Sequence, residues 1–164
     1  MPDHRVLTTL SKQLANMVIL YSPVQMAADL VENYEGEAAV EFLERMPADW
    51  AESHVLNARI GESITIARRK ADGEEWYVGT TTNAEARTLS IPLEVLDDGQ
   101  TYVAHVFEDT PEADYQDAPH AYRIRRGLVT SEDLIEADLA RSGGQAVILE
   151  PATAEEEKQY DALE

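Results

Sequence analysis

The sequence contains no cysteine, and this absence excludes a disulfide scaffold, a zinc centre built from thiolates and a cysteine nucleophile. It also has no apolar run of the roughly 18–20 residues that a membrane-spanning helix needs. Its first residues lack the apolar stretch of a signal peptide. We therefore predict a soluble globular protein without a membrane partner, in a compartment that the sequence does not define.

Positive charge is the second scarce feature. The 164 residues include 13 Lys and Arg against 32 Asp and Glu, which gives a formal net charge of −19 at pH 7. Such a surface repels nucleic-acid phosphates and anionic lipid headgroups, so we predict neither as a partner. Excess carboxylate with little lysine is typical of proteins that work in concentrated salt. We predict that salt stabilises this chain by screening its self-repulsion.

Apolar residues in the first fifty positions recur every three or four residues, as on one face of a helix. The clearest stripe comprises Leu7, Leu10, Leu14, Met17, Val18 and Tyr21. Thr8 or Thr9 can cap its start. Pro23 interrupts the pattern, and two further helix-compatible runs follow. We predict a helical segment over residues 1–53.

From His54 the period of the apolar residues changes to two, which indicates seven or eight short β-strands. No helical pattern lies between these strands, so the sheets should be antiparallel. We predict a mainly β fold, an antiparallel β-sandwich of Greek-key type over residues 54–150, preceded by the helical segment. Residues 151–164 form an acidic tail that we predict to be disordered, because only Tyr160 and Leu163 offer apolar anchorage.

The polar residues form no recognisable catalytic pattern. The histidines, which lack the spacings of a zinc site, are His4, His54, His105 and His120. An acidic stretch offers oxygen ligands for calcium without the spacing of an EF-hand loop, and we interpret it as a solvated connection between strands. Its carboxylates are Glu108, Asp109, Glu112, Asp114 and Asp117. We assign no catalytic, cofactor-binding or metal-binding residue.

Several short motifs occur in order along the chain. They are residues 22–29 (SPVQMAAD), 66–70 (IARRK), 76–79 (WYVG), 82–83 (TN) and 143–144 (GG). Together they resemble the C-terminal end of glycoside hydrolase family 97, and the resemblance covers about residues 14–149. The sequence departs from the family at residues 49–53 (DWAES), where the family has Trp-Asp-Glu-Thr.

Enzymes of this family are α-glucosidases and α-galactosidases with an N-terminal β-domain, a catalytic (β/α)8 barrel and a C-terminal β-sandwich. The resemblance implies that residues 1–53 correspond to the last helical part of the barrel and residues 54–150 to the sandwich. The family's catalytic carboxylates and calcium-binding glutamates precede the matched segment. The resemblance therefore implies a non-catalytic accessory fragment of a calcium-dependent glycosidase, with no cofactor of its own and the catalytic barrel as its partner.

Two other functions stay open at this point. A free-standing carbohydrate-binding or protein-interaction module needs outward-facing aromatic side chains, for which Tyr77 and Tyr122 are candidates. A small hydrolase would use carboxylates that no motif identifies. In each case the apolar stripe within residues 7–21 needs a cover, which is either the sandwich itself or a second copy of the chain.

Overall fold

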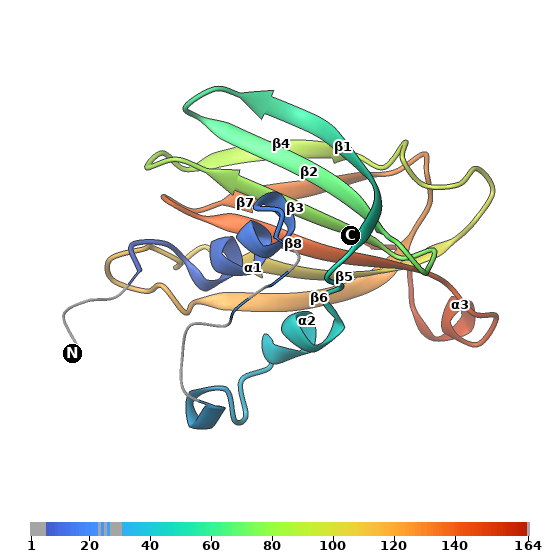
Figure 1. The fold of residues 1–164 in the computed structure, drawn as a ribbon, viewed down its shortest axis with the longest axis horizontal. Coiled ribbons are helices and arrows are strands. Elements are labelled where there is room, and N and C mark those ends of the chain that lie inside the picture. Colours follow the sequence, from blue (N-terminus) through green and yellow to red (C-terminus); the bar gives the residue numbers. More distant parts are fainter. Residues whose placement is uncertain (1–5, 23, 25, 27–30, 164) are drawn as a thin grey trace.

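The computed structural model describes residues 6–22, 24, 26 and 31–163 (Figure 1). Within them the larger antiparallel sheet has the strand order β1-β2-β3-β8-β5-β6, and a smaller sheet pairs β4 with β7. The strands are β1 (Trp50–Arg59), β2 (Ser63–Lys70), β3 (Trp76–Thr82), β4 (Arg87–Pro92), β5 (Tyr102–Asp109), β6 (Tyr122–Val129), β7 (Leu134–Leu139) and β8 (Gly144–Pro151). The predicted antiparallel β-sandwich is confirmed.

The main core lies between the two sheets. Side chains alternate along a strand, so one face of the larger sheet supplies Trp76, Ala104 and Val147 to this core. The smaller sheet supplies Ile91 and Ile135 from the opposite side. In β3 and β5 every residue is buried, which means that the larger sheet is covered on its second face as well.

Helices form that second cover. Helix α1 (Leu10–Ile19) lies over β3 and β8, and α2 (Val40–Arg45) follows it in the chain (Figure 1). Phe42 of α2 packs edge-on against two aromatic rings of the sheet, with centroids 6.2 Å from Tyr77 and 5.3 Å from Phe107. The protein is therefore a three-layer structure of small sheet, large sheet and helices.

The first and third helical runs are confirmed as α1 and α2, whereas the prediction of a helical segment is wrong for residues 50–53, which form the start of β1. Thr9 caps α1, because its side-chain oxygen accepts a hydrogen bond from the Lys12 backbone N–H at 3.3 Å. Leu14 and Val18 at the centre of the apolar stripe are buried against the sheet, whereas Leu7 and Tyr21 remain exposed. The second run shows only a short 3₁₀ turn, η1 (Val31–Asn33), and its residues 23, 25 and 27–30 lie outside the described part.

Helix α1 packs directly against two glycines of the sequence motifs. A Cβ atom on Gly79 of β3 would lie 2.5 Å from the Ala15 carbonyl oxygen. A Cβ on Gly144 of β8 would lie 2.6 Å from the Lys12 Cα. Only glycine allows the helix backbone to approach the strand backbones this closely, so these positions join the helical layer to the sandwich.

The predicted disorder of residues 151–164 is wrong for the described residues 151–163. Thr153 and Glu156 form a capping box at the start of α3 (Glu156–Gln159). Beyond α3 the chain pairs with the edge of β6, where the Leu163 N–H donates to the Leu128 carbonyl at 3.0 Å. Leu163 also packs against the main core. This one apolar anchor and the backbone hydrogen bonds suffice to order the segment.

Strand β1 begins at Trp50, ahead of the position where the alternation of the sequence starts. The register of β1 against β2 shifts between Trp50 and Glu52, so a bulge interrupts the two-residue period there. That irregularity hides the first residues of the strand from a periodicity argument. The boundary between residues 53 and 54 stays a prediction.

Candidate interaction surface

The acidic stretch that follows β5 does not converge on a metal site. Glu108 is buried at the end of β5 and accepts hydrogen bonds from Arg123 at 2.6 Å and Arg125 at 2.7 Å. Burial raises the pKa of this carboxyl, but the two arginines outweigh burial and leave the pKa below its usual value. Glu108 is therefore an ionised partner for arginine rather than a proton donor.

Asp109 holds the turn between β7 and β8 through hydrogen bonds, close to the start of α1. One carboxylate oxygen accepts the backbone N–H groups of Ala140 and Gly144, each at 3.1 Å. Burial raises the pKa of Asp109, and nearby donors that include the Thr9 hydroxyl oppose the rise. A Cβ on Gly143 would lie 2.0 Å from the same oxygen, so the hydrogen bonds of Asp109 require a glycine at this position of the motif. The interpretation of this stretch as solvated is thus wrong for Glu108 and Asp109.

Of the remaining carboxylates of the stretch, Asp114 has a local role. Asp114 accepts the backbone N–H of Gln116 at 2.8 Å and closes a turn. Its other oxygen lies 3.5 Å from Arg141. Among the residues that the structure describes, no group of three or more His, Asp or Glu side chains is placed to hold a metal ion.

The two tyrosines proposed for carbohydrate stacking do not face outward, and that part of the alternative is wrong. Tyr77 is 2% exposed, and its hydroxyl donates to the Arg45 carbonyl of α2 at 2.6 Å. The Tyr122 hydroxyl bonds to Glu37 and accepts the Ala39 N–H at 3.2 Å. Burial is the main cause that raises the pKa of each tyrosine to about 12. The helical layer occupies the face on which a sugar would have to stack.

A charged cluster ties α2 to the sheet around the buried His105. The Arg126 Nε donates to His105 Nδ1 at 3.0 Å, which leaves the ring proton on Nε2, 3.6 Å from Glu150. Arg45 of α2 pairs with both Glu150 and Glu41. Burial lowers the pKa of His105, and Arg45 lowers it further. Glu150 and Glu41 oppose this shift without reversing it, so the site favours the neutral form of His105.

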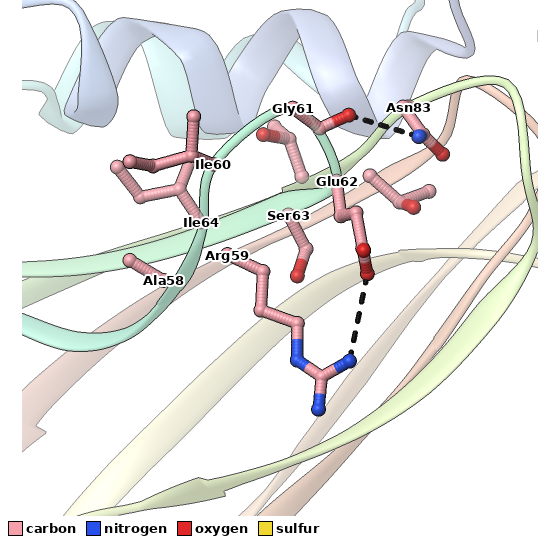
Figure 2. A pocket seen from close by; sticks show the side chains of 10 residues that line it. Ala58, Arg59, Ile60, Gly61, Glu62, Ser63, Ile64 and Asn83 are labelled. Atoms are coloured by element: carbon pink, nitrogen blue, oxygen red, sulfur yellow. Dashed lines mark hydrogen bonds and ion pairs between the residues drawn. The ribbon is translucent and has the colours of Figure 1, made fainter.

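Apolar side chains are exposed on the same side of the large sheet as the helices. Beside α1 these are Val6, Leu7, Leu20, Tyr21, Val24 and Met26. On and next to β1 they are Val55, 63% exposed, and Ile60, which is fully exposed at the tip of the β1–β2 hairpin. A hollow of about 360 Å³ adjoins Ile60 and is lined by Ala58, Ile64 and Thr81, among others (Figure 2).

The two edges of the large sheet are treated differently. The β6 edge is occupied at Leu128 by the chain's own C-terminal segment. The β1 edge pairs only with β2 among the described strands, and most of its residues are exposed. An uncovered edge strand presents free backbone donors and acceptors to another strand. Together with the exposed apolar residues, this edge is the candidate interaction surface.

The described residues form a β-sandwich domain whose buried charges serve packing and whose exposed apolar groups lie at its margin. The family model described as the glycosyl hydrolase 97 C-terminal, oligomerisation domain matches residues 49–150. The chain belongs to this family, and the resemblance inferred from the sequence motifs is confirmed.

Similar proteins agree with this assignment. A retaining alpha-galactosidase of Bacteroides thetaiotaomicron is 34% identical over 140 residues, which cover 85% of this chain and 20% of that protein. The solved structure of a glycoside hydrolase family 97 enzyme from Pseudoalteromonas sp. strain K8, in complex with acarbose, superposes with a TM-score of 0.89. That enzyme is 39% identical, and the match covers 91% of this chain and 23% of the enzyme.

The chain spans about a fifth of the length of the curated relatives that it matches. It corresponds to a C-terminal, non-catalytic fragment of the family 97 glycosidases and not to the whole enzyme. No described helix is long and apolar enough to span a membrane.

Proposed function

We propose that this chain is an accessory domain that joins protein surfaces within a family 97 α-glycosidase. One surface is the catalytic part of the enzyme, and the other is a second copy of the domain. The observation that carries the proposal is the distribution of exposed apolar side chains in a strongly acidic chain. Among the described residues, all the large exposed apolar side chains except Leu134 of β7 lie beside α1 or on and next to β1.

The face beside α1 suits the catalytic barrel. It combines the exposed Leu20, Tyr21 and Met26 with a helix that is fixed to the sheet through Gly79 and Gly144. A contact made by this face therefore also fixes the position of the sandwich, because close-packed interiors deform little. The family model, described as an oligomerisation domain, supports the second surface within residues 49–150.

For the parent enzyme we propose hydrolysis of α-galactosides or α-glucosides. One relative is named a retaining alpha-galactosidase, and the solved neighbour is a complex with acarbose. Calcium, which the resemblance implies for the parent, would then be held outside the described residues of this chain. We further propose that the protein works in concentrated salt, since its formal charge is −19.

Two measurements on the purified chain test the accessory role. Incubation with p-nitrophenyl α-galactoside or α-glucoside and added calcium should release no nitrophenol above the blank, and turnover would contradict the non-catalytic assignment. Sedimentation velocity over a range of protein concentrations should show reversible self-association. A single monomeric species at every concentration would contradict the oligomerising role.

A further inference from the structure

We propose that two copies of this chain associate through the outer edge of β1, antiparallel and strand to strand, about a two-fold axis beside Val55. The inference rests on the proposed function and adds the surface that performs it. A two-fold contact requires a surface that complements itself, so the argument depends on what β1 places opposite a second β1.

The edge itself is the first observation. Of the two edges of the large sheet, the β6 edge already holds the C-terminal segment through the Leu128–Ala162 bridge. Glycine at position 127 makes room for that segment, since a Cβ there would lie 2.6 Å from the Leu163 Cα. The C-terminal segment thus blocks the β6 edge at Leu128, whereas β1 has ten residues and pairs on one side only among the described strands.

Charge complementarity fixes the register. Only one antiparallel register places the acidic end of β1 against its basic end, and it sets Glu52 opposite Arg59 of the second copy. The two-fold axis then makes this pair twice. Arg59 is the freer partner, because its side chain is 74% exposed and lies 3.7 Å from Glu62, its nearest carboxylate in the same chain. Opposite charges directly across an antiparallel pair stabilise it.

The directions of the β1 side chains also agree with this register. Glu52 and Arg59 pair with Arg69 and Ser63 of β2, and both lie on the face toward the small sheet. Residues opposite each other in an antiparallel sheet point to the same face, so the register is geometrically consistent at this pair. It is also consistent for the two pairs inside it, Ser53 with Ala58 and His54 with Asn57.

The centre of the register coincides with an irregularity of β1. The pairing with β2 shifts between Val55 and Asn57, so Leu56 is a bulged residue that turns toward the main core. A bulge discourages indiscriminate strand addition, whereas a closed two-fold pair needs only short regular runs on either side of it. Val55 stays on the helical face, next to its symmetry mate.

Apolar groups extend the contact beyond the backbone. Ile60 is fully exposed at the hairpin tip, and Figure 2 shows its side chain beside Ile64 at the margin of the hollow. The two-fold axis brings one hairpin tip toward the start of β1 in the other copy. In the proposed contact the second copy covers this isoleucine, which is otherwise exposed to water.

The absence of cysteine makes disulfide trapping a clean test. In the proposed register the two Val55 Cα atoms lie roughly 6 Å apart by ordinary sheet spacing, within the range that a disulfide closes. Val55→Cys should therefore give a covalent dimer under mild oxidation with glutathione disulfide. Leu134→Cys on β7 is the matched control, because Leu134 is 61% exposed and Val55 is 63% exposed. The control should remain monomeric on reducing-agent-free gels.

Charge variants test the register without new bonds. In sedimentation velocity, Arg59→Glu should weaken association by about tenfold, because it opposes like charges at two symmetric positions. Adding Glu52→Arg should restore association in the double variant. Circular dichroism of each variant shows whether it has folded. A folded Glu52→Arg/Arg59→Glu protein that associates no better than Arg59→Glu would overturn the register.

The outcomes separate this inference from the function on which it rests. If the wild type associates but Val55→Cys and Leu134→Cys cross-link at equal rates, the β1 surface is wrong and the oligomerising role survives. If the wild type is monomeric at every concentration, both fail. Rapid cross-linking at Val55 with rescue by the double charge swap supports the two-fold contact as proposed.

Discussion

Replacing Gly79 with alanine tests whether the helical layer is an integral part of the sandwich. The added Cβ would meet the Ala15 carbonyl oxygen at 2.5 Å and the Val18 Cβ at 3.0 Å. Ordinary van der Waals contact begins at 3.4 Å, so α1 has to move away from β3 by about 0.9 Å. The nearest clash is with backbone, and no side-chain rotation relieves it.

The size of the effect follows from how α1 is held. The same helix is seated at Gly144, where the strand backbone approaches Lys12, so a shift at Gly79 loosens a second contact. It also opens the core formed by Leu14, Val18 and Tyr77. Overpacking a filled core costs about 1–3 kcal/mol. For a domain of this size, 2 kcal/mol lowers the melting temperature by about 4–8 °C.

The assay is thermal unfolding followed by circular dichroism, with hydrogen exchange to locate the loosened element. Gly127→Ala is the matched control, since its Cβ would clash with the Leu163 backbone at 2.6 Å in the same sheet. Gly79→Ala should expose the amides of α1, and Gly127→Ala should expose those after α3. A melting temperature within 1 °C of the wild type for Gly79→Ala, with unchanged exchange in α1, would refute the seating argument.

Three further predictions concern charge, pH and the C-terminal segment. The melting temperature should be higher in about 2 M than in about 0.1 M potassium chloride, because salt screens a net charge of −19; an equal or lower value contradicts this. Burial lowers the pKa of His105 in the folded state, so the unfolded chain binds the proton first and stability should fall as the pH drops below about 6.5. Urea titrations at pH 7.5 and 5.5 measure this loss, and His105→Gln should reduce it; an equal loss in the variant would assign the effect elsewhere. Leu163→Ala should cost about 1 kcal/mol by removing a partly buried anchor, and an unchanged urea midpoint would show that the backbone pairing with Leu128 is sufficient.

The strands could be predicted from the sequence because most of them obey one simple period. The run at residues 102–107 places apolar side chains on both faces, and β5 is indeed buried along its whole length. Such a pattern already requires two covers, one on each side of the sheet. The family motifs added the glycines of β3 and the β7–β8 turn, whose roles became clear only from the helix packed above them.

Periodicity cannot tell which alternate face meets solvent, and this explains the error on the tyrosines. Tyr77 lies on the face opposite Trp76 and Val78, as an outward residue of a two-layer sandwich would. A third layer covers it, and the sequence that builds this layer is some thirty residues distant, at Phe42 and Arg45. Likewise, no local pattern distinguishes Glu108 and Asp109 from the exposed carboxylates around them, because their partners come from β6 and the β7–β8 turn.

The family match covers less of the chain than the packed unit does, and this difference concerns the N-terminal boundary of the domain. The match begins at residue 49, before β1, and leaves α1 and α2 outside. Yet Tyr77, Phe107 and Ile148 form their core with α1 and α2, so a sandwich cut at that boundary would expose these apolar side chains to water. Fully burying one such side chain is worth about 1.5–3 kcal/mol, and a domain is stable by only about 5–15 kcal/mol. Removing the helical layer would therefore take most of the stability away. We infer that α1 and α2 belong to the folding unit of the sandwich, whatever part of the parent enzyme they also contact.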